Sequence, residues 1–112
     1  MPFLTRGVLI HARCEWTESV EMPQLPLLEA ARVDACFLTD HPAPGAQWLH
    51  ANGHDALDPF TALAFVAANS ARLKMFTNVL VLPYRNPFIT AKAAATLQVL
   101  SGGRFILGVG GG

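Results

Sequence analysis

The chain has 112 residues, of which 52% are hydrophobic and 14% charged. This composition predicts one globular domain over residues 1–112 and excludes a disordered segment. Eight basic and eight acidic residues balance, so the sequence lacks the electrostatic footprint of a partner of nucleic acid or of an anionic membrane surface. Arg6 interrupts the apolar N-terminal stretch and there are only two cysteines, which predicts a cytoplasmic protein without signal peptide. The most apolar region, residues 59–83, contains too many polar residues for a membrane span.

The first half of the chain predicts two strands and one short helix. The stretches RGVLIHA (residues 6–12) and ACFLTD (35–40) favour strands, with a short helix expected over residues 25–32. The connection that follows, DHPAPGAQWLHANGHDAL (40–57), is rich in proline, glycine and histidine. A loop of this length in a compact domain usually has a function, and this one follows the carboxyl end of a strand.

Two helix starts are clear in the second half. The pairs Asp58-Pro59 and Asn86-Pro87 each place an N-cap residue before a proline at the first helical position. The first helix continues to about residue 71, and the second ends at the glycine pair 102–103. Both are apolar over most of their surface, which predicts substantial burial.

Two further strands complete the series. LKMFTNVLVLP (73–83) lies between the helices and is typical of a strand covered on both faces, and RFILGVG (104–110) has the same pattern. Alternating strands and helices joined by short turns form right-handed parallel βαβ units. The predicted fold class is therefore α/β, with about four parallel strands and intervening helices.

Asp40 and His41 stand where the second strand gives way to the long loop, the end at which α/β folds keep their chemistry. An imidazole can act as general acid or base near neutral pH, and the neighbouring carboxylate could orient it. A histidine that only caps the loop fits the same spacing. The sequence leaves both interpretations open for His41.

Other histidines raise the question of a metal. His50 and His54 are four residues apart, and His41 or Asp55 could complete a ligand set. The spacing matches no strong zinc pattern, so a solvated polar loop is favoured and no metal is predicted.

Five more residues, at three places in the chain, carry alternatives. Thr77 and Asn78 are polar in an apolar strand, and a buried asparagine needs either backbone partners or a ligand. Arg85 suits either a bound anion or a surface acid, with the surface role favoured. Gly108 and Gly110 resemble the opening of a backbone cradle for phosphate or flavin, although close strand packing explains them equally well.

Taken together, FLTDHPAP and the segment from GHDALDPF through FTNVLVLPYRNPF to RFILGVGGG resemble the luciferase-like monooxygenase family, particularly its deazaflavin-dependent oxidoreductase branch. The resemblance covers residues 33–112. It implies a (β/α)8 TIM barrel, of which this chain supplies the N-terminal half, four strands of eight. It also implies FMN or a deazaflavin (coenzyme factor 420) at the carboxyl ends of the strands, with hydride transfer or flavin-peroxide oxygenation.

By this resemblance, His41 takes the active-site histidine position, beside Asp40, and both are assigned as catalytic. The residues assigned to cofactor binding are Thr77, Asn78, Val79, Gly108 and Gly110. The family's non-prolyl cis peptide bond would join Asn78 to Val79. The implied partner is a small organic substrate.

Four parallel strands without closure leave unpaired edges and apolar faces, so we expect a homo-oligomer or pairing with a missing C-terminal half. The competing hypothesis is a truncated, catalytically silent half-barrel that acts only as a folding or assembly unit. A nucleotide-binding doubly wound domain would need a helix directly after the terminal glycines, which the sequence lacks.

Overall fold

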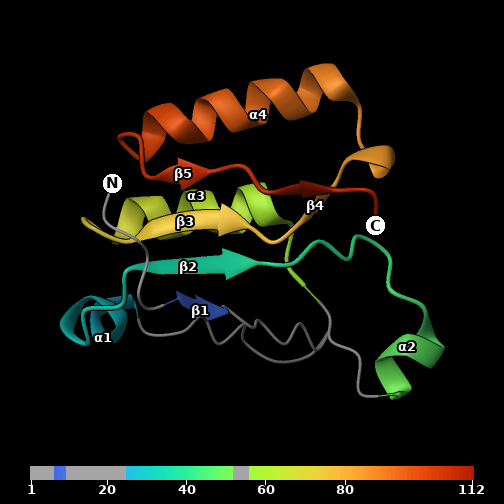
Figure 1. Ribbon diagram of the computed structural model, residues 1–112, viewed down its shortest axis with the longest axis horizontal. Helices are drawn as coiled ribbons and strands as arrows, with labels where there is room; N and C mark the ends of the chain where they lie inside the picture. The colour runs from blue at the N-terminus through green and yellow to red at the C-terminus, as the bar shows by residue number, and fades with distance from the viewer. Residues whose placement is uncertain (1–6, 10–24, 52–55) are drawn as a thin grey trace.

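The computed structural model describes residues 7–9, 25–51 and 56–112 (Figure 1). The strands are β1 (Gly7–Leu9), β2 (Ala35–Leu38), β3 (Lys74–Thr77), β4 (Leu80–Val81), β5 (Phe105–Ile106) and β6 (Val109–Gly110). The helices are α1 (Leu25–Ala30), α2 (Ala46–His50), α3 (Pro59–Asn69), the short 3-10 helix η1 (Leu82–Tyr84) and α4 (Pro87–Leu100). None of the helices in the described parts of the chain has the length and apolar character that crossing a bilayer requires.

Four strands form a parallel sheet in the order β1-β2-β3-β5, and β4 and β6 form a separate parallel pair. Cys36 of β2 lies opposite Val8 and Met75, and Met75 lies opposite Phe105. The prediction of an α/β fold with four parallel strands is confirmed. Because the strands run in the same direction, their carboxyl ends share one edge, from which the chain leaves toward α2 (Figure 1).

Both predicted helix starts are confirmed in their capping geometry. The Asp58 carboxylate accepts a hydrogen bond from the Thr61 N–H at 2.9 Å, and the Asn86 side-chain oxygen accepts from Phe88 and Ile89 at 3.0 and 3.2 Å. In each helix a proline occupies the first turn, where its missing N–H costs nothing. The amino ends of α3 and α4 are therefore fixed by local sequence.

The core lies between α3 and one face of the four-stranded sheet. Leu63 and Val66 of α3 are fully buried, together with Cys36 of β2 and Met75 of β3. Along β3, buried residues alternate with half-buried ones because successive side chains point to opposite faces. The prediction that this strand is covered on both faces is therefore wrong for the described residues.

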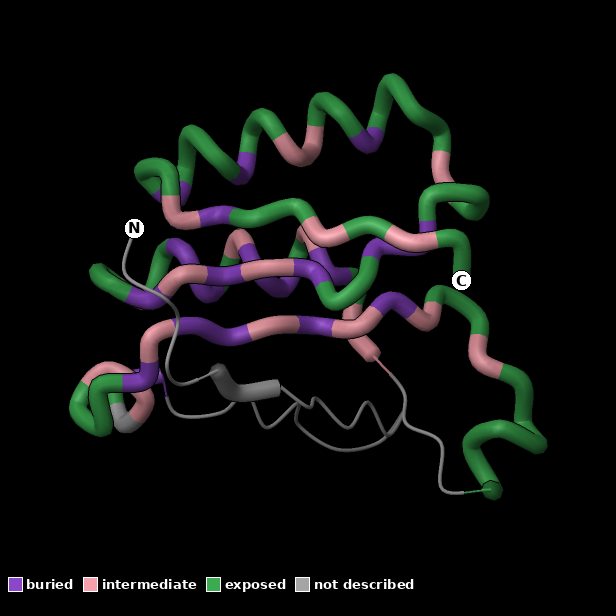
Figure 2. Tube along the Cα trace, in the orientation of Figure 1, coloured by how far each residue is buried: buried purple, intermediate pink, exposed green. Residues whose placement is uncertain are grey.

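The helix α4 is much less buried than its composition predicts. Only Thr90 and Leu97 of this helix are buried, whereas Phe88 and Ile89 are 83% and 71% exposed (Figure 2). Its alanine-rich face, including Ala94, packs against the core that α3 forms. The opposite face has no cover among the described residues, so the apolar composition does not translate into burial.

Three predicted segments are divided in the structure. The expected strand over residues 73–83 is β3, a break, β4 and η1, and the expected strand over 104–110 is β5 and β6. The long connection over 40–57 contains the short helix α2. The breaks in the two strands coincide, and the residues at the first break, Asn78 and Val79, line a hollow at the carboxyl edge of the sheet.

Candidate active site

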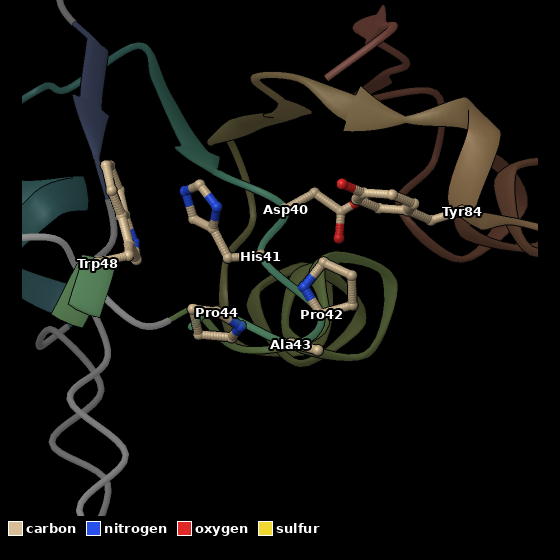
Figure 3. Close-up of a pocket in the computed structure, with 7 residues that line it drawn as sticks. All are labelled: Asp40, His41, Pro42, Ala43, Pro44, Trp48 and Tyr84. Atoms are coloured by element: carbon tan, nitrogen blue, oxygen red, sulfur yellow. The ribbon is translucent and has the colours of Figure 1, made fainter. Parts of the chain in front are cut away.

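A cavity of about 510 Å³ opens at the carboxyl end of β2. Its lining consists of Asp40, His41, Pro42, Ala43, Pro44, Trp48 and Tyr84 (Figure 3). Most of this wall comes from the start of the long connection, where the predicted catalytic pair Asp40 and His41 lies. The structure thus places both residues at a concave surface, as their position after a strand led us to expect.

His41 shares this cavity with an aromatic side chain from α2. The His41 and Trp48 rings lie 5.6 Å apart between centroids and are tilted by 41°. In Figure 3 the imidazole lies beside the indole, while the Asp40 side chain extends the other way, toward Tyr84. The larger cavity therefore combines one titratable ring with an aromatic and prolyl wall.

A second, smaller hollow of about 260 Å³ adjoins the first. Its lining consists of Thr39, Asp40, His41, Asn78, Val79, Val81, Tyr84 and Gly112. Asp40, His41 and Tyr84 line both cavities, so they form the wall between them. The smaller hollow lies where β3 gives way to β4, which is the segment that the resemblance assigns to a cofactor.

The Asp40 side chain is 1% exposed, and its carboxylate accepts several hydrogen bonds. The Val81 N–H donates to one oxygen at 3.0 Å, as does Arg85 Nε at 3.1 Å, and Arg85 Nη2 donates to the other oxygen at 2.6 Å. The hydrogen bond with Asp40 raises the pKa of Arg85, against the opposing effect of partial burial. Asp40 is therefore bound firmly to Arg85, and its assignment as a group that orients His41 stays a prediction.

Thr77 and Gly108 bond to each other across the junction of the two broken strands. The Thr77 hydroxyl donates to the Gly108 carbonyl at 2.7 Å and accepts from the Gly108 N–H at 3.0 Å. A Cβ on Gly108 would lie 2.2 Å from the Thr77 carbonyl oxygen. These contacts support the packing explanation for Gly108. If Thr77 or Gly108 contributes to cofactor binding, it does so by holding the broken strands together.

Gly110, two residues after Gly108, also permits a close approach. A Cβ there would lie 2.7 Å from a methyl group of Val79. The glycine allows β6 to approach the residue that, with Asn78, lines the smaller hollow. Gly112 lines the same hollow and was not predicted.

The peptide bond between Asn78 and Val79 is cis, as the resemblance implied. Asn78 was expected to be buried, but its side chain is exposed and Val79 is 38% exposed. The correction follows from the break after Thr77, which turns these two residues out of the sheet toward the smaller hollow. The Asn78 N–H still donates to the Leu38 carbonyl at 2.8 Å, which ties the turn to β2.

Of the metal candidates, the structure describes His41 and His50. His50 is exposed at the end of α2, whereas His54 and Asp55 lie outside the described residues. Within the described ranges, no group of three or more histidine, cysteine, aspartate or glutamate side chains is placed to hold a metal ion.

Sequence reasoning did not single out Trp48 or Tyr84 as site residues. For Arg85 it favoured a surface acid as partner; an exposed carboxylate, that of Asp58, does lie 3.5 Å away, but the two hydrogen bonds of Arg85 go to the buried Asp40. The signal for Trp48 was an aromatic residue in a long functional loop, and Tyr84 follows a strand end in the same way as His41. Arg85 pairs with a carboxylate 45 positions earlier, a contact that no local pattern shows.

Parallel strands with helices between them, and cavities at the carboxyl edge, are the arrangement expected of part of a β/α barrel, a fold that keeps its sites at the carboxyl ends of the strands. The family model described as luciferase-like monooxygenase matches residues 20–112. The chain therefore belongs to the luciferase-like monooxygenase family.

Two curated relatives indicate the range of the family. The chain is 40% identical over 85 residues to the F420-dependent glucose-6-phosphate dehydrogenase of Kineococcus radiotolerans, which covers 75% of this chain and 24% of that protein. It is 36% identical over 81 residues to 4-hydroxyprotoasukamycin monooxygenase of Streptomyces nodosus subsp. asukaensis, covering 60% and 22%. The chain thus spans about a quarter of the length of these relatives.

Solved structures share the fold. The oxygenating constituent of 3,6-diketocamphane monooxygenase from Pseudomonas putida, in complex with FMN, superimposes with a TM-score of 0.71 at 18% identity over 98% of this chain and 30% of that chain. The coenzyme F420 dependent tetrahydromethanopterin reductase from Methanopyrus kandleri gives a TM-score of 0.67 at 23% identity, covering 97% and 27%. The fold of this chain is that of a fragment of such a TIM-barrel enzyme.

Proposed function

We propose that this chain contributes the carboxyl-edge site of a flavin- or deazaflavin-dependent oxidoreductase of the luciferase-like class. The activity would be hydride transfer or flavin-peroxide oxygenation of a small organic substrate. The observation that carries the proposal is the shared wall of two adjoining cavities, with His41 in it, at the position where the family keeps its chemistry. The names of the relatives, which include F420-dependent dehydrogenases and a monooxygenase, support the cofactor class.

The residues at the smaller hollow fit a flat, partly polar ring. Val79 presents an exposed apolar side chain and Asn78 an exposed carboxamide, which has both donors and an acceptor. FMN or a deazaflavin has an apolar ring face and a polar edge that these two groups suit. When bound, such a cofactor supplies the hydride or oxygen chemistry that side chains cannot perform.

The larger cavity is proposed for the substrate. Its volume lies within the range of about 300 to 1,000 Å³ typical of small-molecule sites, and its prolines and Trp48 offer an apolar wall. His41 stands between this cavity and the smaller hollow. Its proposed role is to hold or move a proton on the substrate, which suits an imidazole near neutral pH.

Titration of the chain with FMN, and separately with the deazaflavin coenzyme, tests the cofactor assignment by fluorescence. We expect a dissociation constant in the micromolar range for one of them. Val79→Asp should weaken this binding at least tenfold, because it places a charge at the apolar wall. Val99→Asp, on the exposed face of α4, is the matched control and should bind normally. No binding of either cofactor would favour the competing proposal of a catalytically silent half-barrel.

The role of His41 has its own test. In the cofactor-loaded protein, His41→Ala should keep cofactor affinity and lower turnover by roughly 100-fold, the usual scale for loss of an acid or base. His50→Ala removes an exposed imidazole from α2 and serves as the control. An unchanged rate in His41→Ala would assign His41 to the structure of the loop.

A cytoplasmic location remains part of the proposal. Cys36 is a buried free thiol, and unpaired cysteines are typical of proteins in a reducing compartment.

A further inference from the structure

We propose that Arg85 is a positioning residue for His41, acting through a two-pronged ion pair with Asp40. The inference rests on the proposed function in so far as His41 is taken as the acid-base group. It names the residue that fixes the position of the imidazole, a role that the resemblance does not assign.

The Asp40–Arg85 pair has the geometry of a rigid clamp. Two guanidinium nitrogens of Arg85 donate to the two carboxylate oxygens of Asp40, at 3.1 and 2.6 Å. Such planar pairing fixes orientation as well as distance, which a lysine ammonium cannot do. The Asp40 side chain is 1% exposed and that of Arg85 19% exposed, so water competes little for either group.

Arg85 also connects this carboxylate to the rest of the site. Its Nη1 lies 3.5 Å from the Asp58 carboxylate, which caps the amino end of α3, and its guanidinium lies 5.7 Å from the centre of the Phe60 ring. The Val81 N–H adds a bond from β4 to Asp40. One guanidinium therefore joins the end of β2, the amino end of α3 and the connection before α4.

The two residues next to this pair line both cavities, as Asp40 itself does. His41 follows Asp40 in the chain and Tyr84 precedes Arg85, and all but Arg85 line the shared wall. Fixing Asp40 against Arg85 thus fixes the backbone from which the imidazole and the phenol project. The Asp40 side chain extends away from the imidazole, toward Tyr84 (Figure 3), so the pair acts on His41 through the backbone.

The test follows the His41 ring signals by NMR in the cofactor-free 112-residue chain, with assignment from their loss in His41→Ala. In Arg85→Met, the His41 ring signals should be shifted or broadened by exchange. Arg85→Lys should restore them only in part. Guanidinium ion added to a variant with space for it, Arg85→Ala, should move them back toward the wild-type position.

Arg72→Met is the matched control. Arg72 also pairs with a carboxylate, that of Glu29 at 3.6 Å, but on the loop before β3, at the amino end of the sheet. It should leave the His41 signals in place. His41 signals that are unchanged in Arg85→Met, or displaced equally by Arg72→Met, would overturn the proposal.

Removing Arg85 alone leaves a buried carboxylate without its partner, which can prevent folding. The double variant Asp40→Asn, Arg85→Met removes both charges, and it should fold and still show displaced His41 signals. Wild-type His41 signals in this double variant would also overturn the proposal. Because this measurement uses no cofactor, it is decided separately from the binding test of the proposed function. In the cofactor-loaded protein, Arg85→Met should lower kcat at least tenfold and leave cofactor affinity unchanged.

Discussion

Replacing Gly108 by alanine tests how closely the segment between β5 and β6 approaches β3. The new Cβ would lie 2.2 Å from the Thr77 carbonyl oxygen, more than 1 Å closer than the 3.4 Å at which ordinary contact begins. The obstacle is backbone, so no side-chain rotation can relieve the clash. The two strands must separate at this point, or the alanine variant does not adopt this structure.

The cost follows from the bonds at this junction. The Thr77 hydroxyl donates to Gly108 at 2.7 Å and accepts from it at 3.0 Å, and the Leu80 N–H donates to the Gly108 carbonyl at 2.8 Å. Each such bond contributes about 0.5 to 1.5 kcal/mol net, and overpacking typically costs about 1 to 3 kcal/mol. Separation relieves the clash at the expense of the bonds, so we expect Gly108→Ala to lower the free energy of unfolding by about 2 to 4 kcal/mol.

Urea denaturation followed by circular dichroism measures this change. Gly111→Ala is the control, because a Cβ at Gly111 would have no atom within 4 Å, and its free energy of unfolding should stay within about 0.5 kcal/mol of wild type. Thr77→Val removes the two hydroxyl bonds and should cost about 1 to 3 kcal/mol. A Gly108→Ala variant as stable as Gly111→Ala would refute the close approach.

Three further predictions concern other parts of the chain. Partial burial alone would raise the pKa of Glu29, but hydrogen bonds from the backbone N–H groups of residues 71–73 together lower it. The stabilisation of the fold by the charged Glu29 carboxylate is present above the pKa of the unfolded carboxyl and is lost as the pH falls through the lowered folded value. Tm should therefore fall more steeply with acidification in wild type than in Glu29→Gln. Equal slopes of Tm against pH in the two proteins would contradict this prediction. Burial raises the pKa of Cys36 to about 11. In a Cys14→Ser background, a thiol reagent should therefore react with Cys36 only when the chain unfolds. Fast reaction with the native chain would count against the buried position of Cys36. The apolar exposed face of α4, where Val99 is 79% exposed, predicts self-association, which light scattering should show as a mass above 12.0 kDa that falls in Val99→Lys; a stable monomer at high concentration would disprove it.

The parts of the fold that the sequence predicted are those set by neighbouring residues. Asp58 and Asn86 cap their helices through N–H groups two or three positions away, so the capping pattern is complete within a few letters. The parallel order follows from the alternation of strands and helices, because a helical crossover returns the chain in the same direction. The burial of α4 was not predictable in this way, because it depends on which elements cover the helix.

The break in the predicted strand over residues 73–83 depends on distant residues. Thr77 ends β3, and its hydroxyl donates to the carbonyl of Gly108, 31 positions later. The Gly108 carbonyl also accepts a hydrogen bond from the N–H of Leu80, where β4 begins. By residue propensity alone, residues 73–83 form one apolar, β-branched run, which predicts a single strand. The sequence marked the place through the polar pair Thr77 and Asn78, but it suggested a buried asparagine where the structure turns the side chain out.

The Asp40–Arg85 pair bears on which side chain handles protons at this edge. Both oxygens of the Asp40 carboxylate accept hydrogen bonds, from the Arg85 guanidinium and from the Val81 N–H. Arg85 cannot deprotonate near neutral pH. Both charges are thus committed to structure, although the sequence suggested Asp40 as a direct partner of His41. Of the side chains of Asp40, Arg85 and His41, the imidazole is then the one left for the proton chemistry proposed for this site, and the adjacent pair holds that imidazole in place.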